Sequence, residues 1–215
     1  MITIYLGNKN YSSWSLRAWL ALRHTGAPFR EELFDLTAPG VREAIRERSP
    51  TGRVPALEDG EVRVWDSLAI GEYLAERFPE AGLWPVDTSG RATARSVVAE
   101  MHSGFQDLRR HMPMNVRRSS PGKGRAEGVE ADIERIRSSW RHCRARYGAG
   151  GEFLFGAFSL ADCFYAPVAF RFATYAVELD PPCRAYCDAL LALPAMQEWR
   201  SAAEREPATD PAYDR

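Results

Sequence analysis

Lysine, cysteine and long apolar runs are scarce in this sequence. Lys9 and Lys123 are the only lysines among 28 lysines and arginines, and the formal net charge is −1. A charge so close to zero argues against nucleic acid or an anionic membrane as the main partner. No stretch approaches the roughly 20 apolar residues of a membrane span, and the first ten residues lack a signal-peptide pattern. We therefore expect a cytoplasmic protein.

Metal-binding and phosphate-binding motifs are missing as well. The cysteines all lie in the second half of the chain: Cys143, Cys163, Cys183 and Cys187. The last two are four residues apart and suit one helix face, but no further ligand follows nearby, so we interpret them as buried thiols. The four histidines form no H-x-x-x-H pattern, and no glycine-rich phosphate loop is present. We expect no metal ion.

The chain contains 45% apolar and 27% charged residues over 215 positions, as in a globular protein with two small domains. Up to about residue 80, strand-like and helix-like segments alternate. The predicted order is a strand (2–6), a helix (13–25), a strand (29–36), a short helix (40–49), a hairpin (54–65) and a helix (66–78). This β-α-β-α-β-β-α order predicts an α/β domain of the thioredoxin-like kind over residues 1–80.

A linker rich in proline and glycine follows, and residues 90–215 are predicted to form an all-helical domain. Apolar residues from Val97 to Met112 keep helical spacing, which predicts one long first helix. The apolar stretch 158–175 predicts a central helix. Ser159 and Asp162 at its start have the form of a capping box, so we assign both a structural role.

The stretch "NKNYSSWSLRAWLAL" lies where the first strand turns into the first helix. Thiol-redox proteins place a C-x-x-C pair at such a junction, and this chain carries Ser12 and Ser15 at that spacing. Either Ser12 or Ser13 can cap the helix while the other hydroxyl faces a ligand. The pattern allows a plain helix cap or a site for a thiol from another molecule.

Two further segments contain candidate binding residues. In "SPTGRVPALEDG", Pro55 suits the start of a strand, and a cis bond there leaves the main chain of Val54 free to pair with a short peptide. In "WDSLAI", the N–H groups of a helix start and the Ser67 hydroxyl suit a carboxylate, and Asp66 suits an ammonium group. Together they fit the zwitterionic end of an amino acid, although one of the two side chains can simply cap its helix.

These pieces occur in the order and spacing of one family. Over essentially its whole length the chain resembles the cytosolic glutathione transferases, through "YSSWSLRAWLAL", "SPTGRVPALEDG", "DSLAIGEYLAERFP" and "FSLADC". Within that family "SSWSLR" is most similar to the zeta group, which is maleylacetoacetate isomerase-like and has S-S-C-S-x-R at this point. Trp14 stands where that cysteine would be.

The resemblance implies that Ser12, or alternatively Ser13, donates a hydrogen bond to the glutathione sulfur. It also implies glutathione contacts from Val54, Asp66 and Ser67. We also expect Arg53 and His102 to lie beside glutathione, and Trp14 to form a wall of the substrate pocket.

The function implied is that of a glutathione transferase, which activates the thiol of glutathione for attack on a small electrophile. The alternatives are a glutathione-dependent cis–trans isomerase and a non-catalytic binding protein with the same fold. The family is typically homodimeric. Zeta-like substrates bear carboxylates, and we expect Arg117 or Arg118, at the end of the predicted long helix, to orient an anionic electrophile.

Overall fold

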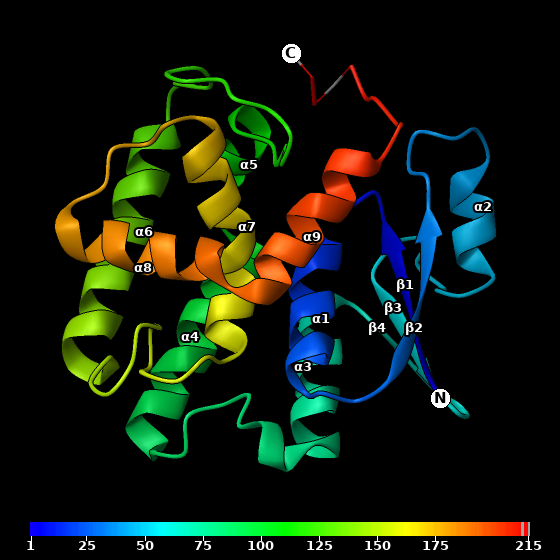
Figure 1. The fold of residues 1–215 in the computed structure, drawn as a ribbon, viewed down its shortest axis with the longest axis horizontal. Helices are drawn as coiled ribbons and strands as arrows, with labels where there is room; N and C mark the ends of the chain where they lie inside the picture. Colours follow the sequence, from blue (N-terminus) through cyan, green and yellow to red (C-terminus); the bar gives the residue numbers. More distant parts are fainter. Residues whose placement is uncertain (212, 215) are drawn as a thin grey trace.

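A computed structural model describes residues 1–211, 213 and 214 of the chain. Figure 1 shows a small sheet with its helices beside a larger helical region. The elements are, in chain order, β1 (Ile2–Gly7), α1 (Ser13–His24), β2 (Phe29–Phe34), α2 (Val41–Arg46), β3 (Ala56–Asp59), β4 (Val62–Trp65), α3 (Ser67–Arg77), the 3₁₀ turn η1 (Pro79–Ala81), α4 (Thr88–Ser103), α5 (Gln106–His111), α6 (Val129–Tyr147), α7 (Leu160–Thr174), α8 (Pro181–Ala192) and α9 (Pro194–Arg205).

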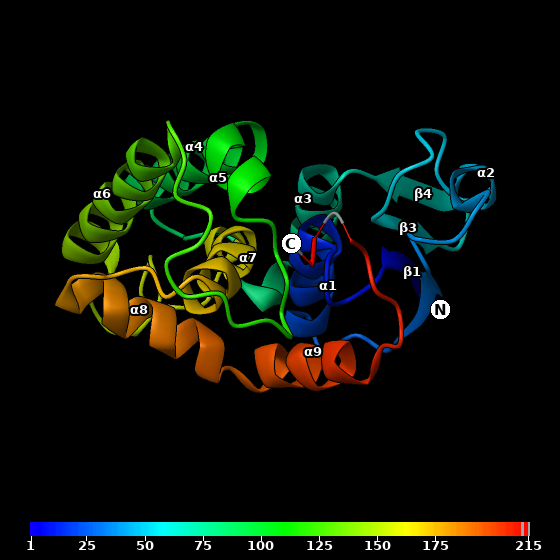
Figure 2. The same ribbon diagram turned by 90° about the horizontal axis from the view of Figure 1, so that it is seen from above.

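The sheet has the strand order β2-β1-β3-β4. β1 runs parallel to β2 and antiparallel to β3, and β3 forms a hairpin with β4. In Figure 2, α1 and α3 lie between this sheet and the helical region, while α2 lies on the far side. This is the predicted thioredoxin-like arrangement, followed by an all-helical region.

Helices α1 and α7 are buried on nearly every side. Leu16, Trp19 and Leu20 of α1 and Phe164 of α7 are all at most 1% exposed. α1 packs against α3 on one side and α7 on the other, and α7 also contacts α4 and α8. Helices enclosed in this way are largely apolar, because little of their surface meets water.

The predicted long helix from Val97 to Met112 is wrong, because it breaks into α4 and α5. Phe105 has a φ of 60°, in the left-handed region that a continuous helix excludes. A Cβ at Gly104 would lie 2.9 Å from the Glu100 carbonyl oxygen, so this close approach favours glycine. The break gives α5 its own direction and turns Arg109 toward the sheet domain.

After α9 the chain returns to the first domain. Glu206 accepts hydrogen bonds from the backbone N–H groups of Lys9 and Asn10, nearly 200 residues away in sequence. The red segment in Figures 1 and 2 follows this path past the start of α1. Within the described residues, none of the helices has the length and apolar character needed to cross a membrane.

Candidate active site

The loop between β1 and α1 presents two serine hydroxyls. Ser12 is the N-cap of α1: its Oγ accepts the Ser15 N–H at 3.3 Å and lies 2.7 Å from the Ser15 Oγ. Ser15 is fully buried, and its Oγ also accepts the N–H of Gly7 at 3.0 Å. Ser12 and Ser13 are each 6% exposed and line the same cavity. The Ser12 hydroxyl is therefore both a helix cap and a cavity group.

The start of α3 carries the second candidate pair. Asp66 caps this helix by accepting the N–H groups of Leu68 at 2.8 Å and Ala69 at 3.4 Å. Its φ is 76°, which is uncommon for a residue other than glycine, and the next residue, Ser67, is 1% exposed. The Ser67 hydroxyl is buried and has no hydrogen-bond partner within the described part of the chain. An unpaired buried hydroxyl costs free energy until a ligand pairs with it.

Val54 and Pro55 lie directly before β3. The bond between them is cis, and the strand pairing starts only at Ala56, which lies opposite Tyr5 and Trp65. The main chain of Val54 thus lies outside the ladder. A cavity of about 430 Å³ is lined by Trp14, Thr51, Arg53, Val54, Pro55, Trp65, Asp66 and Ser67. The structure brings six of the predicted residues into this one cavity.

A second cavity adjoins the first through Trp14, Arg53 and Val54. Its volume is about 500 Å³. It is lined by Tyr11, Ser12, Ser13, Trp14, Leu36, Thr37, Arg42, Arg53, Val54, Arg109, Pro113, Arg171, Asp210 and Tyr213. The serine hydroxyls therefore line the second cavity, next to Trp14, which lines both cavities.

Arg17, one turn into α1, is completely buried behind Trp14. Its guanidinium carbon lies 4.4 Å from the centre of the Trp14 ring and 4.9 Å from that of Phe164. None of its three side-chain nitrogens has a hydrogen-bond partner among the described residues. Burial, and next the charge of Arg109, lower the pKa of Arg17 well below its usual value. Because a guanidinium keeps its charge in proteins, Arg17 places a positive charge behind Trp14, which the Asp66 carboxylate partly balances.

Two guanidinium groups, those of Arg109 and Arg171, line the second cavity from the helical region. Arg109 donates to the backbone of Gly104 at 2.8 Å and to that of Met101, and its guanidinium carbon lies 5.0 Å from the centre of the Trp14 ring. Arg171 donates to the carbonyl of Met112 at 2.9 Å. Burial, with Arg109 next, lowers the pKa of Arg171 to about 9. Both are held by carbonyl dipoles, so a bound anion would relieve the repulsion between them.

His102 lies at the edge of the site and not among the residues that line either cavity. Its ring packs edge-on against Trp14 at 5.2 Å, and its Nε2 lies 3.3 Å from the Asp66 carboxylate. Burial lowers the pKa of His102, and Asp66 opposes that effect. The neutral ring links the Asp66 side of the site to Trp14.

The structure does not bring Arg117 or Arg118 into the cavities. Arg117 donates to the carbonyl of Glu206, to that of Ala208 at 2.7 Å and to the Tyr11 hydroxyl at 3.1 Å. These acceptors occupy its guanidinium, so it is not free to bind an electrophile. Arg118 is half-buried and does not line either cavity. The arginines that face the second cavity from the helical region are Arg109 and Arg171.

Ser159 and Asp162 lie away from both cavities. The Asp162 carboxylate accepts the N–H of Ser159 at 2.8 Å and its hydroxyl at 2.9 Å, in the capping-box arrangement that the sequence predicts. It also accepts the Leu154 N–H at 3.2 Å and the Tyr186 hydroxyl at 3.0 Å. Burial raises the pKa of Asp162 to about 6. These contacts tie three parts of the helical region together.

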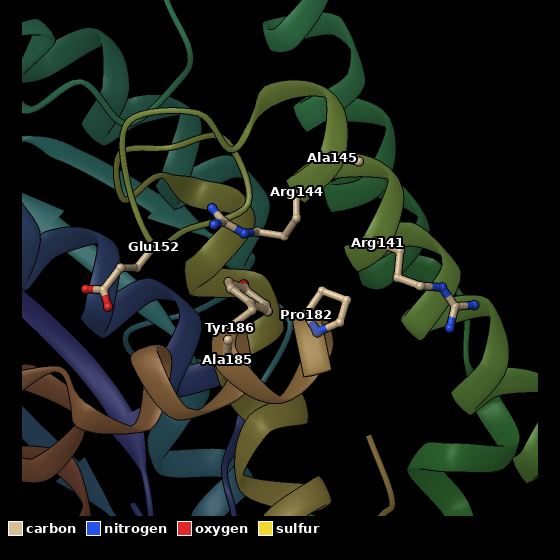
Figure 3. A pocket seen from close by; sticks show the side chains of 7 residues that line it. All are labelled: Arg141, Arg144, Ala145, Glu152, Pro182, Ala185 and Tyr186. Carbon is tan, nitrogen blue, oxygen red and sulfur yellow. The ribbon is translucent and has the colours of Figure 1, made fainter. Parts of the chain in front are cut away.

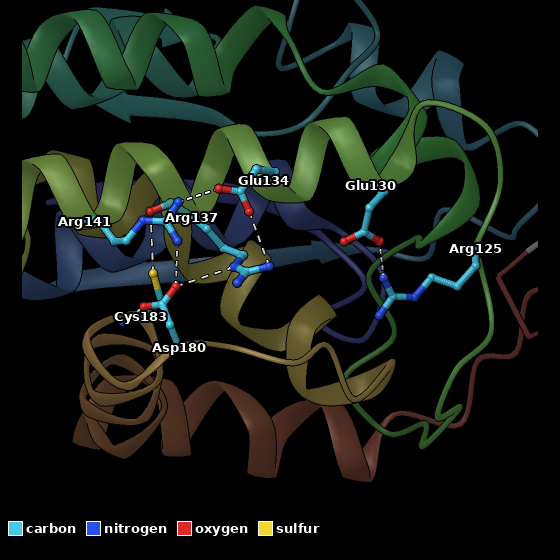
Figure 4. A network of polar contacts seen from close by, with 7 residues as sticks. All are labelled: Arg125, Glu130, Glu134, Arg137, Arg141, Asp180 and Cys183. Atoms are coloured by element: carbon cyan, nitrogen blue, oxygen red, sulfur yellow. Dashed lines mark hydrogen bonds and ion pairs between the residues drawn. The ribbon is translucent and has the colours of Figure 1, made fainter.

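Another cavity, of about 450 Å³, lies between α6 and α8 (Figure 3). Its arginines are occupied: Arg144 donates to the carbonyls of Gly148, Gly151 and Phe153. Arg141 pairs with Glu134 and with Asp180, where the distance is 2.8 Å (Figure 4). The described residues contain no group of three or more His, Cys, Asp or Glu side chains placed to hold a metal ion.

Sequence reasoning did not assign Arg17, Arg109 or Arg171 to the site, and it named Ser15 only for its spacing from Ser12. A signal was present for two of them. Arg17 and Arg171 are single charges inside otherwise apolar helices, "SWSLRAWLAL" and "YAPVAFRFATY". Arginine is rarely buried without a partner, so a lone arginine in a buried helix points to a ligand.

A thioredoxin-like domain that presents hydroxyls to a cleft walled by an all-helical domain is the architecture of a glutathione transferase. The chain matches the models for the N-terminal domain of glutathione S-transferase, over residues 11–77, and for its C-terminal domain, over residues 126–201. It is 31% identical over 176 residues to glutathione S-transferase Z2 of Arabidopsis thaliana, a match that covers 77% of this chain and 74% of that protein. The chain belongs to the glutathione S-transferase family.

Two more relatives extend the comparison. A probable maleylacetoacetate isomerase of Caenorhabditis elegans is 36% identical over 97 residues, which is 45% of this chain and 44% of that protein. The match thus spans less than half the length of this relative. The structure of a glutathione transferase homolog from Burkholderia, with bound glutathione, superposes with a TM-score of 0.73 at 24% identity, covering 95% of this chain and 99% of that one. At this identity the likeness concerns the fold.

Proposed function

We propose that the protein binds glutathione in the cavity beside β3 and α3 and activates its thiol for attack on an electrophile in the second cavity. The Ser67 hydroxyl carries this proposal, because it is buried and has no hydrogen-bond partner among the residues that the structure describes. The γ-glutamyl carboxylate pairs with Ser67 and its ammonium with Asp66. The main chain of Val54 pairs with the cysteinyl residue, which directs the sulfur toward Ser12.

The Ser12 hydroxyl stabilises the thiolate through a chain of hydrogen bonds. A serine hydroxyl has one proton and two lone pairs, and the proton rotates to suit its partners. In the structure the Ser12 hydroxyl donates to the Ser15 Oγ. When its proton turns to the sulfur, Ser15 donates to Ser12 instead, and the chain runs from the Gly7 N–H through Ser15 and Ser12 to the sulfur. Each bond polarises the next. Lowering a thiol pKa by about two units takes roughly 2.7 kcal/mol, and a hydrogen bond to a charged acceptor contributes about 1.5–3.

The acceptor that best suits the second cavity is an anion. Arg42 and Arg53 lie on the sheet-domain side, where the glycyl carboxylate of glutathione would lie. Arg109 and Arg171 remain for a carboxylate on the electrophile, and buried Arg17 adds its field behind Trp14. Guanidinium groups match carboxylates in shape as well as charge. We assign to Arg109 and Arg171 the role that the sequence suggested for Arg117 and Arg118.

The same arrangement serves a glutathione-dependent cis–trans isomerase as a second candidate. The thiolate adds to one carbon of a conjugated double bond and the electron pair moves onto the neighbouring carbonyl. The remaining single bond rotates, and reversal of the addition returns the thiolate. Arg109 and Arg171 in the second cavity favour the isomerase, because an enolate and a carboxylate both need positively charged partners.

Retention on immobilised glutathione is the first test. We expect the protein to be retained, and Ser67→Ala to weaken binding of free glutathione about tenfold, roughly 1.4 kcal/mol. Arg118→Gln is the control, since Arg118 lies outside both cavities. A protein that passes over the resin unretained contradicts the proposal. Retention without a lowered thiol pKa identifies a non-catalytic binding protein instead.

A homodimer and a cytoplasmic location complete the proposal. Val62 on the edge strand β4 is 45% exposed, which suits contact with a second chain. Sedimentation should give the mass of a dimer, and a monomer at every concentration contradicts this assignment.

A further inference from the structure

The loop of residues 8–12 determines where the Ser12 hydroxyl lies. The N–H groups of Tyr11 and Ser12 both donate to the Asn8 carbonyl, at 3.2 and 2.8 Å, which makes a tight turn between β1 and α1. The geometry of this turn fixes the direction in which Ser12 enters the helix. Hydrogen bonds that hold the turn therefore act on the proposed thiol donor.

Glu206, one residue beyond the end of α9, holds one side of this turn. Its two carboxylate oxygens accept the N–H of Lys9 at 2.6 Å and the N–H of Asn10 at 3.0 Å. The indole N–H of Trp199 donates to the Lys9 carbonyl at 2.8 Å. Bonds between a carboxylate and backbone N–H groups are charge-assisted and short, and about twice as strong as neutral ones.

Arg117 closes the other side. Its guanidinium donates to the carbonyls of Glu206 and Ala208 and to the Tyr11 hydroxyl, as described above. The backbone N–H of Arg117 donates to the Asn10 side chain at 3.0 Å. Two segments that are about 100 and 200 residues away in sequence thus meet around residues 9–11.

We infer that Glu206 and Arg117 are positioning residues, which hold the turn of residues 8–12 so that the Ser12 hydroxyl points at the glutathione sulfur. A hydroxyl fixed in advance stabilises a thiolate better than one that must reorient. This inference rests on the proposed function, in which Ser12 is the thiol donor. It also gives Arg117 a role in the reaction without any contact with the electrophile.

Glu206→Gln tests the inference, because an amide keeps the shape of the side chain but replaces one acceptor oxygen with a donor. We expect the pKa of bound glutathione to rise by about half a unit or more, with its affinity within about twofold of the original. Glu204→Gln is the matched control: it makes the same charge change two residues earlier, at an exposed position of α9. It should leave the thiol pKa unchanged.

Arg117→Gln is the second variant and should shift the thiol pKa in the same direction. It keeps the inference testable if Glu206→Gln does not fold. A lower melting temperature with an unchanged thiol pKa in the folded variants overturns the inference and leaves a purely structural clamp. If the unaltered protein itself does not lower the thiol pKa, the proposed function fails together with this inference. A normal thiol pKa shift in the unaltered protein and in both variants refutes the inference alone.

Discussion

Two arginine-lined cavities of similar volume differ in what their guanidinium groups contact. In the cavity between α6 and α8, Arg141 faces Glu134 and Asp180, and Arg144 faces backbone carbonyls (Figures 3 and 4). The second cavity is lined by Arg109 and Arg171, which donate to neutral backbone carbonyls, and Arg17, buried behind Trp14, has no hydrogen-bond partner among the described residues. Partly exposed ion pairs such as those of Arg141 contribute little to stability, whereas a buried guanidinium without a hydrogen-bond partner costs free energy until an anion pairs with it. Arg144 contacts backbone carbonyls as Arg109 and Arg171 do, so the two cavities differ in the ion pairs of Arg141 and in the lack of a hydrogen-bond partner for Arg17 among the described residues.

The largest expected effect is on stability, at Asp162 in the helical region away from both site cavities. Asp162→Ala leaves the Leu154 N–H, the Ser159 N–H and the Tyr186 hydroxyl without their acceptor. We expect the free energy of unfolding to fall by about 2 kcal/mol or more. Activity per folded molecule should be nearly unchanged. Urea unfolding and an active-site titration measure the two quantities, and a stable but inactive variant shows that Asp162 belongs to the site instead.

The same carboxyl group predicts a pH dependence. Its pKa is about 6 in the folded chain and 3.8 as the ordinary value. Between these values the folded state holds a proton that the unfolded state has lost, so this group's contribution to stability decreases as pH rises from about 4 to 6. Asp162→Asn should remove that slope. Unfolding curves at pH 4, 5, 6 and 7 measure it, and parallel pH profiles for the two proteins contradict the prediction.

Removing the cleft arginines should affect one class of acceptor. The double variant Arg109→Gln, Arg171→Gln should raise KM for a carboxylate-bearing electrophile about tenfold or more, roughly 1.4 kcal/mol. KM for a neutral aromatic halide should hardly change, and it controls for folding. Equal changes in KM for both electrophiles would show that Arg109 and Arg171 do not bind the carboxylate of the anionic one.

Ser15→Ala should change the pKa of bound glutathione although Ser15 does not contact the sulfur. It removes the hydroxyl that lies between the Gly7 N–H and Ser12, so the pKa of bound glutathione should rise by roughly half a unit. The shift should be smaller than that of Ser12→Ala, because Ser12 still donates to the sulfur. A shift equal to or larger than that of Ser12→Ala contradicts this order.

The smallest effect on activity is expected at the cavity between α6 and α8. Arg141→Gln breaks exposed ion pairs to Glu134 and Asp180. The melting temperature should fall slightly, and KM and kcat with both acceptors should stay the same. A selective loss of activity with the anionic electrophile in Arg141→Gln would contradict the view that only the second cavity binds it.

The sequence predicted the parts of the site that depend on local chemistry. A helix cap, a proline before a strand and a Ser after a capping Asp are recognised within a few residues. Ser12, Pro55 and Ser67 could therefore be predicted, and each of them lines one of the two site cavities. The arginines were harder to predict. Arg117 and Arg118 drew attention as adjacent charges, whereas Arg17, Arg109 and Arg171 come from three helices that meet only through tertiary packing.

The break after α4 and the course of the C-terminal segment were also beyond local patterns. The apolar spacing continues through Gly104 and Phe105, so periodicity alone predicts one helix. The bonds from Glu206 to Lys9 and Asn10 join residues almost 200 positions apart. No local propensity encodes a contact of that range.

The central claim is that the Ser12 hydroxyl stabilises the thiolate of bound glutathione. Thiolate absorbance titrated against pH measures this directly in the unaltered protein, Ser12→Ala and Ser13→Ala. We predict a pKa about two units below that of free glutathione, raised by one to two units in Ser12→Ala and almost unchanged in Ser13→Ala. If Ser13→Ala produces the shift instead, the donor is Ser13. A pKa in the unaltered protein equal to that of free glutathione contradicts the account.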